Sequence, residues 1–244
     1  MPQRMTRMDP RLYCVADGPA WQAGHDVSLT GGQAHYLGKV MRLQPDHLVK
    51  LFNGRDGEWS AQIKELKRHS GAVRLLTQER SQQETDGVEL LFSPLKRDAT
   101  ELIIRMGTEL GVTRFRPVVT ARTNTHRLNY ERLSLIAQEA AEQCERLDVP
   151  DIMPMEPLAA LLARWPARRP LSVALERQGE GLASSDSEAL LIGPEGGFSE
   201  EEVRRLTTHE AVRCFSLGTL VLRAETAVCA GLSQLDVRRR GTAQ

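Results

Sequence analysis

Short apolar runs divided by turn-forming residues characterise the first third of the chain. Four runs have the apolar and β-branched content of half-buried strands, at residues 12–15, 48–52, 59–63 and 72–76. The pairs Asn53-Gly54 and Asp56-Gly57 lie between the second and third runs and favour a tight connection. This spacing predicts a small β-barrel.

From residue 88 onward, strand-like runs alternate with helical patterns. Strands are expected at residues 88–93, 115–120, 171–175, 189–192 and 212–217. Helices are expected at residues 98–111, 129–147 and 222–237, with a further helix beginning after Ser199. Two of the strands, 171–175 and 189–192, are as apolar as strands of a parallel sheet covered on both faces. The alternation predicts an α/β domain.

Capping residues and one polar segment define boundaries within this pattern. Asp98 with Glu101, and Ser199 with Glu202, have the spacing of capping boxes, and Gly111 can end the first helix. The segment at residues 81–87 contains no apolar side chain and is the best candidate for a linker. We therefore expect an N-terminal domain of residues 1–78 and a C-terminal domain of residues 86–244.

A glycine-rich loop is the most informative part of the chain. The strand at 189–192 leads into the sequence GPEGGFS at residues 193–199 and then into a helix. Glycines between a strand and a helix usually let a ligand approach bare backbone. Glu200, Glu201 and Glu202 fill the first helical turn, so their charge opposes an anion there. The loop suits a neutral or cationic ligand such as S-adenosylmethionine, and a tight turn without a ligand is the alternative.

A second loop repeats this arrangement. The strand at 212–217 leads through Gly218 into the last helix. In an open parallel sheet both loops follow the carboxyl ends of strands, where ligands bind. The two loops are therefore expected to form one site.

Together the loops resemble the signature of the bacterial 16S ribosomal RNA uridine-N3 methyltransferases, a family of the SPOUT superfamily. The sequence LIGPEGGFS at 191–199 matches the first motif throughout. The sequence LGTLVLRAETA at 217–227 matches the second except at Leu220, where the family usually has arginine, and Ala224, often threonine. Further matching segments are TELGV at 108–112, EAAEQ at 139–143 and HYLGKVMRL at 35–43.

This resemblance implies an N-terminal PUA-like β-barrel and a C-terminal SPOUT α/β domain with a trefoil knot. It also implies a homodimeric enzyme that uses S-adenosylmethionine to methylate N3 of a uridine in 16S ribosomal RNA, within the small ribosomal subunit. Another SPOUT activity, such as ribose 2′-O-methylation, and a non-catalytic RNA-binding or assembly factor are the alternatives. Cofactor binding and the position of the methyl group distinguish the three.

The expected cofactor pocket consists mainly of backbone groups, with Pro194 shaping the loop. Its residues are Leu175, Gly193, Pro194, Glu195, Gly196, Leu217, Gly218 and Leu222. Arg223 and Glu225, at the entry of the last helix, are the catalytic candidates. Arg223 could orient the uracil carbonyls or stabilise the uracil anion, and Glu225 could accept the proton or hold Arg223. A purely structural ion pair between the two is the alternative.

Basic side chains outside the pocket are the candidates for RNA contact. Net charge is zero, but residues 1–80 carry 12 Lys/Arg against 8 Asp/Glu, which makes the expected barrel modestly basic. A solvated surface is the alternative. His35 and Tyr36 are expected at a barrel edge or in its core. The RNA-binding candidates are Arg7, Arg11, Lys39, Arg42, Arg97, Arg122 and Arg146.

Composition excludes several other classes of protein. The four cysteines are scattered, so neither a zinc site nor a disulfide framework is expected, and a reducing cytoplasm fits best. The sequence contains no run of about 18 apolar residues, so no transmembrane helix is expected. The first residues contain arginines with no apolar stretch behind them, which is unlike a secretory signal.

Overall fold

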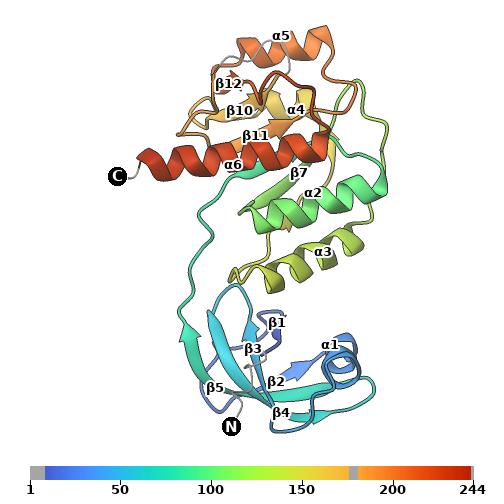
Figure 1. The fold of residues 1–244 in the computed structure, drawn as a ribbon, viewed down its shortest axis with the longest axis vertical. Coiled ribbons are helices and arrows are strands. Elements are labelled where there is room, and N and C mark those ends of the chain that lie inside the picture. Colours follow the sequence, from blue (N-terminus) through green and yellow to red (C-terminus); the bar gives the residue numbers. More distant parts are fainter. Residues whose placement is uncertain (1–8, 176–180, 243–244) are drawn as a thin grey trace, which may run out of the picture. The chain divides into compact units, whose positions relative to one another are not determined.

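The computed structural model describes residues 9–175 and 181–242 (Figure 1). The chain divides into two compact units, and each is described by itself. The units are Met1–Glu84 with Ala141–Asp148, and Thr85–Ala140 with Val149–Gln244. The first unit thus takes in residues 141–148, which lie outside the N-terminal domain expected from sequence.

The first unit is built on a five-stranded sheet with strand order β1-β3-β4-β5-β2. Its strands are β1 (Arg11–Tyr13), β2 (Asp26–Leu29), β3 (Leu48–Phe52), β4 (Glu58–Leu66) and β5 (Gly71–Arg80). β1 pairs with β3 in parallel, and the other pairs are antiparallel. The four expected strands are confirmed. β2 was not predicted, because only two of its four residues are apolar.

A helical segment follows β2 where no helix was expected. α1 (Gly31–His35) runs into a π-helical turn, η1 (Tyr36–Val40). The Thr30 hydroxyl accepts a hydrogen bond from the Gln33 amide at 3.2 Å, and the Gln33 side chain accepts one from the Thr30 amide at 2.9 Å. This capping box starts the helix despite its two glycines.

The expected position of His35 and Tyr36 at a barrel edge or in the core is wrong. Both residues belong to the helical segment, and both are exposed. Leu37 instead supplies the fully buried contact of this segment. The helical spacing turns the neighbouring side chains outward, whereas a strand would have turned one of them inward.

Arg11 holds the chain beyond residue 140 in the first unit. Its guanidinium donates hydrogen bonds to the carbonyl oxygens of Ala141 at 2.9 Å and Arg146 at 2.6 Å. It also forms an ion pair with the buried Glu58, and only 7% of the Arg11 side chain is exposed. The donors of Arg11 are thus occupied inside the unit, so we do not include Arg11 among the proposed RNA contacts.

The same attachment shortens the long helix. α3 (Tyr130–Gln143) ends before the expected residue 147. Glu145 has a φ of +62°, which interrupts the helical backbone, and Arg80 donates a hydrogen bond to its carbonyl oxygen at 2.9 Å. Leu147 is buried although it lies outside the helix, so its place in the apolar pattern gave a false helical signal.

The second unit is an α/β domain, as predicted. Its parallel sheet has the order β12-β10-β11-β6-β7-β8, and β9 also pairs with β7. The strands are β6 (Glu89–Phe92), β7 (Arg114–Val119), β8 (Asp151–Ile152), β9 (Glu156–Pro157), β10 (Leu171–Ala174), β11 (Ala189–Ile192) and β12 (Val212–Phe215). The remaining helices are α2 (Arg97–Glu109), α4 (Leu158–Ala163), α5 (Glu200–Thr208) and α6 (Ala224–Thr242). The sequence pattern did not predict β8, β9 or α4.

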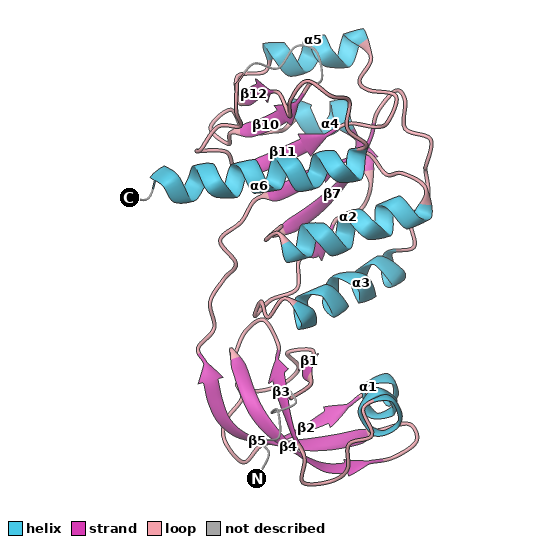
Figure 2. Cartoon of the chain, in the orientation of Figure 1, coloured by secondary structure: helices cyan, strands magenta, loops and turns pink. Residues whose placement is uncertain are grey.

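Alternating side chains of the strands bury opposite faces of the sheet. Leu190 and Ile192 join a core that includes residues of α2, α3 and α6, whereas Leu191 joins a core formed with α4 and α5. Figure 2 shows α2 and α6 lying across one face of the strands. Burial on both faces explains why β11 is apolar at every position. Among the described residues, no helix has the length and apolar content needed to cross a membrane.

Of the two expected capping boxes, one is confirmed and one is wrong. The Ser199 hydroxyl accepts from the Glu202 amide at 3.3 Å, and the Glu202 carboxylate accepts from the Ser199 amide at 2.8 Å, so that α5 begins as predicted. α2 begins at Arg97, which places Asp98 inside the first turn. Glu101 forms an ion pair with Arg97 at 2.9 Å. The expected end of α2 is confirmed, because Gly111 has a φ of +83°.

A buried carboxylate lies at the amino end of β6. Glu89 forms ion pairs with Arg114 at 3.0 Å, Arg116 at 2.5 Å and Arg169 at 2.9 Å. Burial by itself favours the neutral acid, but hydrogen bonds from Arg169 and Arg116 outweigh it and hold the pKa of Glu89 below its usual 4.5. The ionised form therefore stabilises the folded state.

Replacing Arg11 tests whether this side chain holds residues 141–148 in the first unit. We expect Arg11→Met to lower the free energy of unfolding of this unit by about 3–5 kcal/mol, because the buried Glu58 loses its closest cation. Amide exchange at residues 141–148 should accelerate. The control is Arg74→Met, which removes an exposed, solvent-screened ion pair with Asp26 on the same sheet and should change stability far less. Equal stability of the two variants would contradict the assignment.

Replacing Glu89 tests the pH dependence of the second unit. We expect Glu89→Gln to lower the free energy of unfolding by about 1.5–3 kcal/mol at pH 7, where the carboxylate is ionised. The contribution of the wild-type carboxylate is present above its unfolded pKa and is lost as pH falls through its lower folded pKa. Urea unfolding from pH 7 down to pH 3 should thus show that the difference in unfolding free energy between wild type and variant decreases below about pH 4.5. A constant difference in unfolding free energy over this pH range would mean that the ionised carboxylate is not the cause of the difference.

Candidate functional site

The sheet brings the expected cofactor residues to one edge. β10 lies between β11 and β12, with Val173 opposite Leu191 on one side and Cys214 on the other. The three carboxyl ends therefore lie together, and the chain leaves them at Leu175, Gly193 and Ser216. All eight residues predicted for the cofactor pocket lie in the segments that follow these strands.

The glycine loop after β11 is closed by its own contacts. The Gly197 amide donates to the Pro194 carbonyl at 2.8 Å, and Gly197 has a φ of +69°. A Cβ on Gly193 would stand 2.8 Å from the ring of Phe198, so only glycine fits there. Pro194 is buried, whereas Glu195 and Gly196 are exposed. The loop thus has a fixed inner side and an accessible outer side.

The loop after β12 is held less tightly. Leu217 and Leu222 are partly buried against the core. The Ser216 hydroxyl donates to the Gly218 carbonyl and accepts from the Gly218 amide, each at 3.2 Å. Between these anchors Leu220 is 78% exposed. Leu220, one of the two positions at which the chain departs from the family motif, therefore points into solvent, whereas the other, Ala224, is buried.

The two catalytic candidates lie at the start of α6. Arg223 is exposed and, among the described residues, its guanidinium forms no hydrogen bond or ion pair. Glu225 is partly buried, and its Oε2 is buried without a hydrogen-bond partner in the described part of the chain. The structural ion pair considered as the alternative is not formed. A buried acceptor without a donor is costly, and such atoms are common at functional sites.

The RNA-binding candidates have unequal surroundings. Lys39 and Arg42 are exposed on and next to η1, and Arg42 has a φ of +57°. Arg97 is 78% exposed and pairs with Glu101. Arg122 is exposed and donates a hydrogen bond to the Gly196 carbonyl at 2.5 Å. These residues could contact RNA phosphates.

Two other candidates are unsuitable or not described. Only 7% of the Arg146 side chain is exposed, and it pairs with Asp148 at 2.7 Å, so we leave Arg146, like Arg11, out of the proposed RNA contacts. Arg7 lies outside the described residues. Lys96 and Arg127 are exposed in the segments after β6 and β7 and were missed. Their position directly after predicted strands was the signal that could have identified them.

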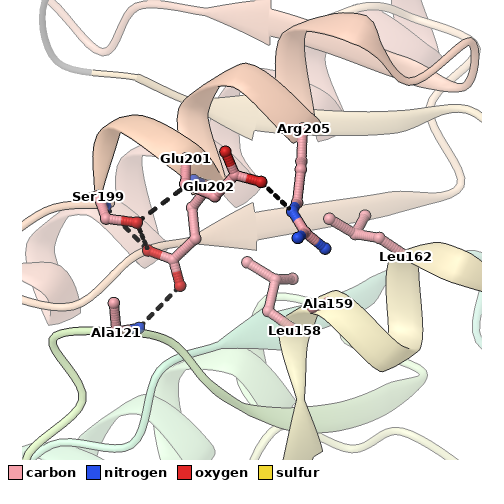
Figure 3. Close-up of a pocket in the computed structure, with 8 residues that line it drawn as sticks. All are labelled: Ala121, Leu158, Ala159, Leu162, Ser199, Glu201, Glu202 and Arg205. Atoms are coloured by element: carbon pink, nitrogen blue, oxygen red, sulfur yellow. Dashed lines mark hydrogen bonds and ion pairs between the residues drawn. The ribbon is translucent and has the colours of Figure 1, made fainter.

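A pocket of about 220 Å³ adjoins the glycine loop between α4 and α5 (Figure 3). Its lining residues are Ala121, Leu158, Ala159, Leu162, Ser199, Glu201, Glu202 and Arg205. The apolar part comes from α4, which was not predicted, and none of the expected cofactor residues lines it. This pocket is therefore distinct from the site at the strand ends. No group of His, Cys, Asp or Glu suited to a metal ion is found among the described residues.

Two family models match the chain. One, described as an RNA methyltransferase domain, matches residues 82–236, and the other, described as an RNA methyltransferase PUA domain, matches residues 29–76. Among curated relatives, ribosomal RNA small subunit methyltransferase E of Rickettsia conorii is 33% identical over 82% of this chain and 85% of its own length. The protein of the same name in Bacillus subtilis is 31% identical over 86% of this chain and 89% of its own length.

Solved structures agree with this result. A Legionella pneumophila protein in complex with S-adenosylmethionine has a TM-score of 0.82 at 26% identity, covering 94% of this chain and 97% of its own. The Neisseria gonorrhoeae ribosomal RNA small subunit methyltransferase E bound to S-adenosyl methionine has a TM-score of 0.85 at 24% identity, with the same coverage, and shares the fold. The expected family is confirmed. The chain belongs to the RNA methyltransferase family that includes the proteins named ribosomal RNA small subunit methyltransferase E.

Proposed function

We propose that this protein is an S-adenosylmethionine-dependent methyltransferase that modifies N3 of a uridine in 16S ribosomal RNA. The observation that carries the proposal is the meeting of two glycine loops at one edge of the parallel sheet, in a chain of this family. The unpaired Arg223 and Glu225 border the second loop. They supply the side chains that proton removal from a uracil ring requires.

The residues at the strand ends fit the proposed cofactor. Gly218 has a φ of +122°, and no described atom lies within 4 Å of the place its Cβ would occupy. Gly196 is likewise exposed, so both loops offer accessible backbone groups to the adenosine and methionine parts. The first turn of α5 carries three glutamates, which favour a cationic sulfonium over a phosphate. When bound, S-adenosylmethionine supplies an electrophilic methyl group.

The side chains next to this pocket have complementary roles in the proposed reaction. Glu225 accepts the proton from N3–H as the ring nitrogen forms its bond to the methyl carbon and the carbon–sulfur bond breaks. Arg223 precedes Glu225 by two residues and stabilises negative charge on the uracil carbonyl oxygens. Holding the nitrogen in line with the methyl group supplies the remaining acceleration.

RNA binding is proposed to use exposed cations of both domains. Lys39 and Arg42 belong to residues 1–78, which we propose to form a closed PUA-like barrel. Arg97 and Arg122 belong to residues 86–244 and lie at the same sheet edge as the glycine loops. Since net charge is zero, these patches must act locally, which favours a structured small ribosomal subunit over naked RNA as the substrate.

The remaining parts of the proposal concern topology and assembly. We propose that α6 threads a trefoil knot of the SPOUT type, which accords with its packing against α2 and β11. We also propose a homodimer in the cytoplasm, with the exposed Leu220 and Val221 close to the subunit interface.

Calorimetric titration with S-adenosylmethionine tests the cofactor site. We expect saturable binding to the wild type, and a loss of affinity of at least about tenfold in Gly196→Val, because a Cβ there already lies 3.3 Å from the Arg122 stem and the branched side chain must displace the loop. Gly32→Ala serves as the control, since Gly32 lies in α1 and has room for a Cβ. Unchanged affinity in Gly196→Val would exclude this loop from the pocket.

Methyl transfer to small ribosomal subunits lacking the modification tests the catalytic pair. We expect Glu225→Gln and Arg223→Ala each to lower kcat by about 10²-fold or more, with affinity for S-adenosylmethionine changed by less than about threefold. Nucleoside mass spectrometry should identify 3-methyluridine as the product. Arg240→Ala, at an exposed position of the same helix, is the control. Near-normal turnover in both variants would mean that neither residue is catalytic.

A further inference from the structure

Two residues that follow β7 are tied to the glycine loop and its helix. The Ala121 amide donates a hydrogen bond to Oε1 of Glu202 at 2.7 Å. Arg122 donates from Nη1 to the Gly196 carbonyl at 2.5 Å. The carbon stem of Arg122 also covers Gly196, because a Cβ there would lie 3.3 Å from it. The turn after one strand thus contacts the middle of the loop that follows another and the first turn of the helix beyond that loop.

The carboxylate of Glu202 serves two segments at once (Figure 3). Its Oε2 accepts hydrogen bonds from the amide of Ser199 at 2.8 Å and from the hydroxyl of Ser199 at 3.0 Å, which closes the capping box. Its Oε1 is directed the other way, toward Ala121. A capping box needs only the first of these oxygens, so the second has a separate role.

Two hydrogen bonds and the contact of the Arg122 stem with Gly196 join the turn to the loop and its helix. The pocket of about 220 Å³ lies beneath the tie, with Ala121 and Glu202 on its rim and the leucines of α4 opposite. The turn itself is stiff, since the Thr120 amide donates to the Thr123 hydroxyl at 2.8 Å and both threonines are buried. A stiff turn bonded to the loop and its helix thus adds a restraint to the loop's own internal contacts.

From this geometry we propose that Glu202 and Arg122 are positioning residues, which hold the glycine loop in the conformation that receives S-adenosylmethionine. The inference rests on the proposed function of that loop. Without the tie, the ligand must order the loop itself, and this ordering lowers affinity. The chemical step depends on other residues, so turnover of a Glu202 variant at saturating cofactor stays close to that of the wild type.

Glu202→Gln separates the tie from the cap. Glutamine can keep the capping box, because its single carbonyl oxygen can accept from the Ser199 amide. Its NH₂ group then faces the Ala121 amide, so that a donor meets a donor and the tie is lost. Glu201→Gln is the matched control, because it removes the same charge from the same helical turn but leaves the tie intact. For Arg122, methionine removes the donor and lysine restores one.

Two measurements test the proposal. The first is amide exchange of residues 193–198 without ligand, and the second is the calorimetric affinity for S-adenosylmethionine. We expect Glu202→Gln and Arg122→Met to accelerate exchange and to weaken binding by about tenfold. Glu201→Gln and Arg122→Lys should stay within about threefold of the wild type. In the double variant Glu202→Gln with Arg122→Met, the fold-loss of affinity should be smaller than the product of the two single fold-losses, because both residues restrain one loop.

The proposal would be overturned if Glu202→Gln had the exchange rates and affinity of the wild type. It would also be overturned if Glu201→Gln lost as much affinity as Glu202→Gln, because the loss would then come from charge alone. Failure of the wild type to bind S-adenosylmethionine would count against the proposed function instead. The exchange measurement needs no ligand, so acceleration in both tie variants would still support the restraint in that case.

Discussion

The parallel pairing of β10 with both β11 and β12 is the constraint on which the candidate site depends. In a parallel sheet every strand ends at the same edge, so loops separated along the chain meet without further adjustment. The two glycine loops have few side-chain contacts of their own to bring them together. Their common location comes from buried backbone hydrogen bonds between apolar strands, which a change in the loops themselves would not disturb.

Charges along this edge are distributed according to strand order. The loop after β11 enters a helix whose first turn carries three glutamates, whereas the segments after the neighbouring β6 and β7 expose Lys96, Arg97, Arg122 and Arg127. An acidic stretch suits a sulfonium, and a basic stretch suits RNA phosphate. A protein with no net charge can therefore present both kinds of surface within one unit, which a count of charges over the whole chain conceals.

Several arginines of this molecule have a structural function. Arg11 and Arg146 are nearly buried, and they bind carbonyl oxygens or carboxylates within the first unit. Arg114, Arg116 and Arg169 surround Glu89 in the second unit. Arg11, Arg114 and Arg169 each bind more than one acceptor residue through a planar fork of donors that lysine lacks. An arginine in a chain that binds RNA is thus weak evidence for an RNA contact until its neighbours are known.

The sequence by itself determined every described strand except β2, β8 and β9, together with the two glycine loops, the cap of α5 and the family. These features depend on neighbours in the chain: an apolar run, a glycine at a turn, or Ser199 three residues before Glu202. The tertiary structure alone decided which arginines are exposed, where α3 ends, and that Glu202 also binds Ala121. Those features depend on contacts between residues far apart in the chain, such as Arg11 with Ala141 or Arg122 with Gly196. Local pattern carries no record of such partners, because the distance between them is set only when the sheets form.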